Sequence, residues 1–255
     1  MVEGGIAMGS ALLPVLLPGF VAAAIGFVLF VGLGDWGGLS SQALAVPNLP
    51  AYNGTHVYAM LVAAVVGVVT AVIVAGVRRG AGTLVTGGRR LGLTVLLVGG
   101  GLAVGLIAQV ADWLGAASQD VLFSGQAGVP ALAATESTKI LLVLLAAKAL
   151  GYAVSLGCSF RGGQVFPAIF LGIAVAEFAH TWFDVSPTLA VAAGAAAGMS
   201  AGTRLLITST LFAALLVGVP GLDAVPAAVL AAATAWLTAQ ALDRRPVPAP
   251  AVSTA

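Results

Sequence analysis

The chain has 255 residues, of which 60% are hydrophobic and only 7% are charged, and its mean hydropathy is +1.10. Soluble domains carry roughly 25% charged residues, so this composition excludes an ordinary water-soluble fold. The net charge is +1, and the few basic residues form no stripe that could neutralise a nucleic-acid backbone, so we expect no nucleic-acid partner. The single cysteine excludes an internal disulfide.

Long apolar runs in the first part of the chain predict membrane-spanning helices, because each is close to the roughly 20 residues that a helix needs to cross the hydrocarbon core. They cover residues 12–33, 57–77, 91–114 and a stretch from 139 to 155. Pro14, Pro18 and Gly19 predict that the first helix is kinked or divided into two parts. We therefore expect a helical integral membrane protein.

Polar segments separate these runs. Residues 34–56 contain Asp35, Trp36 and prolines, which is typical of a loop at the membrane interface. Residues 78–90 begin and end with pairs of arginines around a Gly-rich stretch, and residues 115–138 form a further polar connection. Each of these segments is predicted to be a loop.

The apolar runs become shorter after residue 163. They cover residues 164–182, 188–200, 205–219 and 225–242. Short apolar segments interrupted by glycine or proline are typical of half-membrane helices, whose ends lie near the substrate site of many transporters. We expect residues 1–243 to form one membrane domain and the Pro-rich residues 244–255 to form a tail.

Small residues are abundant in these apolar runs, so close contact between helices is possible on nearly every helical face. Gly194, Gly198 and Gly202 follow the small-xxx-small pattern of closely packed membrane helices. Chance is an equal explanation of this spacing, because the chain contains 34 glycines.

The segment SFRGGQVFPAIFLG, residues 159–172, joins a Gly-rich turn to an apolar helix that is predicted to start near Pro167. Proline suits a first helical turn because its missing N–H would be unpaired there. We expect the amides of residues 163–166 to lie at the helix N-terminus, where unpaired N–H groups and peptide dipoles favour a bound anion. Gly162 and Gly163 would allow the backbone to approach that anion closely. The alternative is a plain Gly-Gly turn before a helix.

The run GGQVFP resembles the G-x-F-x-P signature of the CLC chloride channels and chloride/proton antiporters. Sequence on both sides, VLFSGQAGVPALAATESTKILLVLLAAKAL and AAAGMSAGTRLLITSTLFAALLVG, resembles the segments that flank this signature in the family. The resemblance implies the second half of the CLC fold, an all-α polytopic membrane protein with about eight tilted, partly re-entrant helices. It implies chloride transport by a voltage-gated channel or an antiporter rather than an enzyme, with chloride as substrate and no cofactor.

The same resemblance implies binding residues and partners. Val165 stands where the family more often has phenylalanine, which would change the pore wall. The implied assembly is a homodimer in a lipid bilayer, the inner membrane of a bacterium. No metal ligands are expected, Arg161 and Lys148 are possible accessory residues, and chloride would be bound by Gly162, Gly163, Gln164, Val165, Phe166 and Pro167.

Parts of the family pattern do not occur within residues 1–255. The serine motif G-S-G-I-P and the gating-glutamate motif G-K/R-E-G-P of the first CLC half are missing, and no tyrosine follows Tyr152. We therefore expect the chain to need a separate protein that carries the first CLC half. The alternatives are a non-conducting assembly or regulatory subunit and a truncated remnant of a CLC protein.

Three ionisable residues lie within apolar runs, and each has more than one possible role. Lys148 is either functional or bonded to backbone carbonyls between helices. Glu177 and His180 are three residues apart and therefore share one helical face. They either relay protons, reach the membrane interface or pair with each other.

Overall fold

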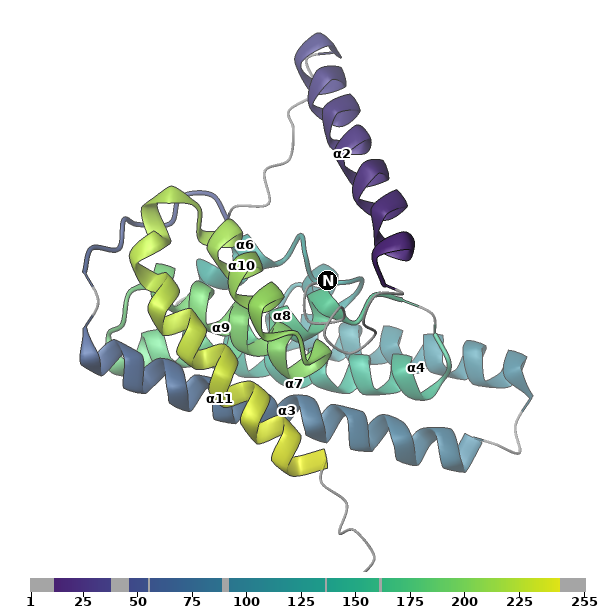
Figure 1. Ribbon diagram of the computed structural model, residues 1–255. Coiled ribbons are helices and arrows are strands. Elements are labelled where there is room, and N and C mark those ends of the chain that lie inside the picture. Colours follow the sequence, from purple (N-terminus) through teal and green to yellow (C-terminus); the bar gives the residue numbers. More distant parts are fainter. Residues whose placement is uncertain are drawn as a thin grey trace, which may run out of the picture.

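The computed structural model describes residues 12–37, 46–54, 56–88, 92–135, 137–160 and 162–243, and within these ranges the chain is helical and contains no strand (Figure 1). The predicted all-α fold is confirmed. The elements are α2 (Leu12–Gly37), α3 (Val57–Gly88), α4 (Leu93–Trp113), α5 (Ser118–Val121), α6 (Val129–Ala133), α7 (Thr138–Gly157), α8 (Val165–Phe183), α9 (Pro187–Thr203), α10 (Leu206–Val217), the 3-10 helix η2 (Val219–Ala224) and α11 (Val225–Asp243).

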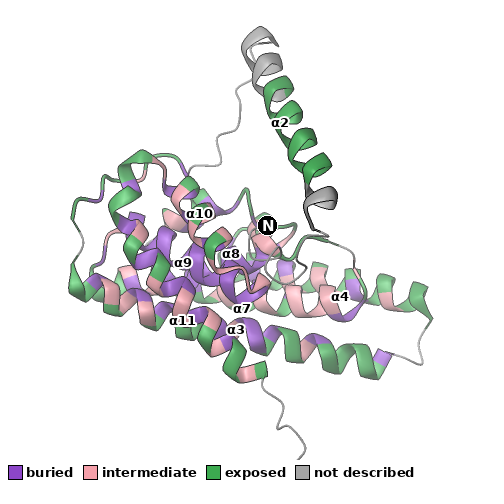
Figure 2. Ribbon diagram, in the orientation of Figure 1, coloured by how far each residue is buried: buried purple, intermediate pink, exposed green. Residues whose placement is uncertain are grey.

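The centre of the fold is the pair α8 and α9. Every residue of α9 from Thr188 to Gly202 is buried, and so is every residue of α8 from Pro167 to Glu177. Figure 2 shows this buried centre, with α3, α7, α10 and α11 packed around the pair. Most α9 side chains are those of alanine or glycine, so several helices can approach its backbone closely.

Glycines bring the backbones of α8 and α9 into direct contact. A Cβ atom on Gly172 would lie 2.1 Å from the carbonyl oxygen of Gly194. A Cβ atom on Gly198 would lie 2.1 Å from the carbonyl oxygen of Ala168. Neither position has room for a side chain, so the close packing predicted from the glycine spacing is confirmed and chance is not its explanation.

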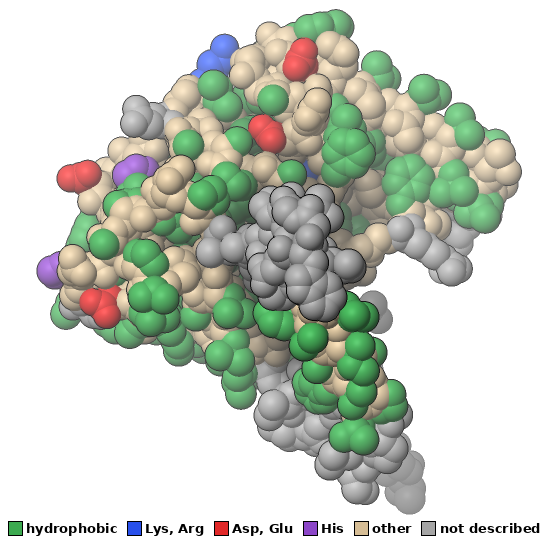
Figure 3. All heavy atoms as spheres, turned by 90° about the horizontal axis from the view of Figure 1, so that it is seen from above, with side chains coloured by type: hydrophobic (Ala, Val, Ile, Leu, Met, Phe, Trp, Pro, Cys, Tyr) green, Lys and Arg blue, Asp and Glu red, His purple; other side chains and the backbone are tan. Residues whose placement is uncertain are grey.

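The outer helical faces are apolar. Among the described residues, five segments are long and apolar enough to cross a membrane: α3, α4, α7, α8 and Val219–Asp243. On α4 the side chains of Leu102, Leu106 and Trp113 are exposed, and Figure 3 shows hydrophobic side chains over much of one molecular face with only scattered charges. Lipid accommodates such a surface and water does not, so the protein is an integral membrane protein.

Two predicted interruptions are absent, which corrects the sequence analysis. The segment from Arg78 to Gly88 is not a loop but the last part of α3. It remains helical because no proline interrupts it and because Arg78 and Arg79 donate hydrogen bonds to the carbonyl oxygens of Gly202 and Leu242, at 3.2 and 3.0 Å. Likewise α2 is one helix that continues through Pro18 to Gly37, so it is not divided into two parts and it includes residues 34–37 of the predicted loop. The predicted connection at residues 115–138 contains the two short helices α5 and α6.

We predict that Gly198→Ala lowers the free energy of unfolding by about 1–3 kcal/mol, because its Cβ would collide with the backbone of α8 and force the two helices apart. The measurement is the thermal unfolding midpoint in detergent. The matched control is Gly105→Ala on α4, where a Cβ would meet no atom within 4 Å. Equal midpoints for the two variants would contradict the packing described above.

Candidate functional site

The helix that carries the GGQVFP run begins at Val165, two residues before the start predicted from Pro167. α7 ends at Gly157, and Ser159, with a left-handed φ of 64°, lies in the turn toward α8. Gln164 is the N-cap residue, so Pro167 occupies the third helical position. A missing N–H in this first turn removes no helical hydrogen bond, as expected for proline.

The backbone amides at this helix start are available to a ligand. The N–H groups of residues 163–166 find no hydrogen-bond acceptor within the described part of the chain. First-turn amides have no intrahelical acceptor, and the aligned dipoles of the 19-residue α8 add roughly half a positive charge at this end. The site therefore favours an anion without using a charged side chain.

Gly162 and Gly163 keep the space before α8 clear. Neither has the positive φ that would favour glycine over other residues. A Cβ atom at either position would meet no described atom within 4 Å. A side chain at either position would therefore extend into open space in front of the amides without a clash among the described residues.

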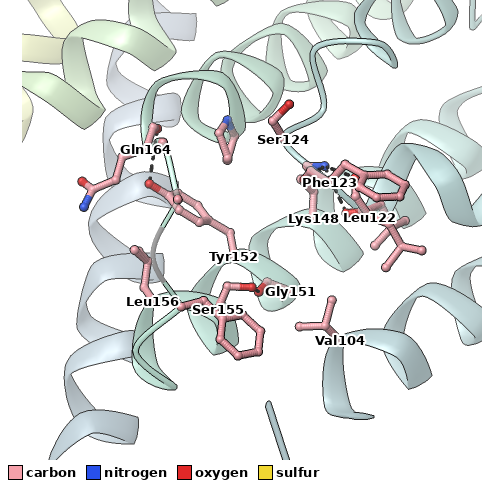
Figure 4. Close-up of a pocket in the computed structure, with 15 residues that line it drawn as sticks. Val104, Leu122, Phe123, Ser124, Lys148, Gly151, Tyr152, Ser155, Leu156 and Gln164 are labelled. Carbon is pink, nitrogen blue, oxygen red and sulfur yellow. Dashed lines mark hydrogen bonds between the residues drawn. The ribbon is translucent and has the colours of Figure 1, made fainter. Parts of the chain in front are cut away.

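This helix start borders a cavity of about 340 Å³ (Figure 4). One water molecule takes roughly 30 Å³ of liquid volume, so the cavity has room for a small anion together with part of its hydration shell. The residues that line it come from α4, from α7, from the end of α5 and the segment after it, and from the turn before α8 and the first turn of α8. They include Ser124, Lys148, Tyr152, Gly162, Gly163, Gln164 and Pro167.

Lys148 of α7 fastens the segment after α5 to the cavity wall. Its Nζ donates hydrogen bonds at 3.0–3.2 Å to four successive carbonyl oxygens, those of residues 120–123. The ammonium lies 4.9 Å from the ring centroid of Phe170, and the side chain is 2% exposed. The interpretation of Lys148 as a residue bonded to backbone carbonyls is therefore confirmed.

The Lys148 ammonium lacks a complete counter-ion in the described structure. Burial raises the pKa of the Asp120 carboxyl above its ordinary value, and the Lys148 charge opposes that shift. No Asp120–Lys148 ion pair forms in the described structure, and four backbone carbonyl oxygens solvate the ammonium. A buried positive charge in the wall raises the electrostatic potential of the cavity and favours an anion there.

Tyr152 is a cavity residue that the sequence analysis did not propose. Its hydroxyl donates a hydrogen bond of 3.3 Å to the carbonyl oxygen of Gln164, and Figure 4 shows the Gln164 side chain turned away from this contact. Tyr152 follows Lys148 by four residues on α7, so the two side chains share a helical face. That spacing is the signal that could have identified it.

The family model for voltage gated chloride channels matches residues 6–240, nearly the whole chain. The chain belongs to the CLC voltage-gated chloride channel family. A search of curated proteins finds no match. Family membership accounts for the apolar helices, because CLC proteins are ion transporters of the membrane rather than enzymes.

The structure of this CLC protein gathers most of the predicted site residues around one cavity. Gly162, Gly163, Gln164, Pro167 and Lys148 all line it. Binding of chloride by these residues stays a prediction.

Two predicted residues, Val165 and Phe166, are not among those that line the cavity. Both pack against the hydrophobic core. The Phe166 ring contacts Phe212 of α10, with ring centroids 5.9 Å apart. Val165 is therefore not part of the wall of this cavity, and its effect on a pore wall stays a prediction. Arg161 lies outside the described residues.

One interpretation of Glu177 and His180, that they pair with each other, is wrong, and a second, that they reach the membrane interface, fails for Glu177 alone. Glu177 is fully buried, so it does not reach the membrane interface. Its two carboxylate oxygens have no hydrogen-bond partner in the described chain, so it does not pair with His180. The Nδ1 atom of His180 instead contacts the carbonyl oxygen of Val185, which follows the end of α8.

We predict that Lys148→Met lowers the free energy of unfolding by about 1–3 kcal/mol, because buried carbonyl groups lose their donor while the side-chain volume is nearly kept. Lys139→Met, also on α7 but exposed, is the matched control. The unfolding midpoint and the hydrogen exchange of the segment at residues 120–125 are measured for both variants. If exchange in that segment is unchanged by Lys148→Met, the clamp assigned to Lys148 is wrong.

Proposed function

We propose that this CLC protein transports chloride across the membrane and that the N-terminus of α8 contacts the ion. The observation that carries the proposal is the set of amides at residues 163–166, which find no acceptor among the described residues, beside a cavity whose wall carries the Lys148 ammonium. Family membership supports anion transport in general. The protein is a chloride/proton antiporter if its anion transport is coupled to proton transport, and a channel if it is not.

The proposed coordination suits transport rather than tight binding. Amide dipoles attract a chloride ion but hold it less strongly than a directly coordinating cation would, so the ion can leave again. The donors of Lys148 are already used on four carbonyl oxygens, so this residue contributes potential rather than a ligand bond. Ion selectivity would then come from the geometry of the backbone at residues 163–166.

We further propose that a first CLC half, which residues 1–255 do not contain, completes the ion pathway. The serine and gating-glutamate motifs of the first CLC half do not occur in residues 1–255. A protein that carries them would supply the gate and the remaining ligands, and the complete transporter would be a homodimer in a bacterial inner membrane. Apolar, small-residue faces of α3, α10 and α11 suit such packing in lipid.

We predict that the purified chain alone passes little chloride in liposomes and that co-reconstitution with a first CLC half produces chloride flux. Gly163→Leu should then abolish this flux, because its side chain would occupy the space before the amides without disturbing the fold. Flux is measured with a chloride electrode after valinomycin clamps the potential. Simultaneous pH recording distinguishes an antiporter from a channel.

Gly105→Leu serves as the control, since this glycine lies on the exposed side of α4 and a Cβ there meets no atom within 4 Å. It should transport like the unaltered protein. Strong flux from the lone chain would remove the need for a partner. Normal flux from Gly163→Leu would show that the ion passes elsewhere, and no flux with any first half would favour a non-conducting subunit.

A further inference from the structure

Glu177 is an ionisable group in the most tightly packed part of the fold. It lies on α8 within the unbroken buried stretch, its exposure is 0%, and neither carboxylate oxygen has a hydrogen-bond partner among the described residues. An isolated carboxylate in such surroundings is very costly, whereas an uncharged carboxylic acid is far less so. A buried polar group without a hydrogen-bond partner is unusual in a native structure and requires an explanation. For an ionisable residue in a membrane-spanning helix, the first explanation to consider is a functional role.

No described charge is available to neutralise Glu177. The helices packed against α8 are α3, α6, α7 and α9, and within their bounds α6 and α9 contain no ionisable residue. The ionisable residues of α3 and α7 are engaged elsewhere or exposed. Tyr58, Arg78, Arg79, Lys148 and Tyr152 donate to backbone carbonyls of other residues, and Lys139 is exposed.

A route from Glu177 to the surface follows its own helix. His180 lies one turn further along α8 on the same face and is half-buried. Its Nδ1 donates to the carbonyl oxygen of Val185, which leaves Nε2 able to accept and release a proton. The exposed residues Trp182 and Phe183 and the C-cap residue Asp184 follow directly.

We infer that Glu177 is a proton-binding site that exchanges its proton with the aqueous phase at the C-terminal end of α8 through His180. The ligand is a proton rather than a metal ion, because a metal site draws on several ligating side chains and the described chain contains no group of three that could hold one. Glu177 follows Val165 by twelve residues, about 18 Å along the helix, so it does not contact an anion at the N-terminus of α8.

Release of this proton has a structural consequence. Every residue of α8 from Pro167 to Glu177 is buried, so Glu177 lacks the surrounding water that a charged carboxylate requires. Ionisation of Glu177 would therefore have to admit water between the helices or shift them. Proton exchange at Glu177 is in this way linked to the packing that holds α8 in place.

The test is infrared difference spectroscopy of the whole purified chain in detergent during a change of pH. We expect the carbonyl band of a protonated carboxylic acid to disappear as the pH rises, and we expect Glu177→Gln to lose this band. Asp120→Asn, which removes an acid outside the central helices, should retain it. An ionised Glu177 at low pH, or no Glu177-dependent change at any pH, would overturn the assignment.

The route is tested by the rate at which the same band shifts when water is replaced by D₂O. His180→Phe should slow this exchange severalfold, whereas Trp182→Phe should leave it unchanged. Equal rates for the His180 variant and the unaltered protein would exclude His180 as the relay. Glu177→Leu supplies a second check: if Glu177→Gln does not fold, loss of the band in the leucine variant supports the assignment and its persistence overturns it.

Discussion

The backbone contact between α8 and α9 is the constraint on which the rest of the structure depends. Gly172, Gly194 and Gly198 allow the two helices to touch without intervening side chains. This contact fixes the direction of the α8 axis. That direction determines where the amides of residues 163–166 point, and these amides have no acceptor among the described residues. α3, α7, α10 and α11 pack around the pair, so the position of the cavity follows from the central contact.

The electrostatic potential at the site comes from peptide dipoles more than from formally charged side chains. The chain has few charged residues, and the amides at residues 163–166 attract an anion through the field of a helix end. Lys148 is solvated by backbone carbonyls, which lets a positive charge stay buried beside the cavity. The same scarcity of charge makes Glu177 exceptional, because nothing described near it offsets an ionised carboxylate.

Much of the helical fold could be predicted from the sequence, because apolar runs, prolines and glycines indicate helix positions locally. Apolar runs located α4 and α7 to α11 within a few residues, and Pro167 with the two preceding glycines located the start of α8. The short helices α5 and α6 were missed, because they lie in the connection at residues 115–138 that was predicted to be a loop. The continuation of α3 past Arg78 was not predictable, because it depends on carbonyl acceptors from helices far along the chain. Tyr152 and the isolation of Glu177 also depend on tertiary contacts, which no local pattern encodes.

The central claim is that the amides at the start of α8 bind chloride, and NMR tests it most directly. The ¹⁵N-labelled chain in detergent micelles is titrated with chloride against gluconate at constant ionic strength. The account predicts saturable shifts that are largest for the amides of residues 163–166 and that are lost in Gly163→Leu. Shifts that are largest elsewhere, or that persist unchanged in this variant, would contradict it.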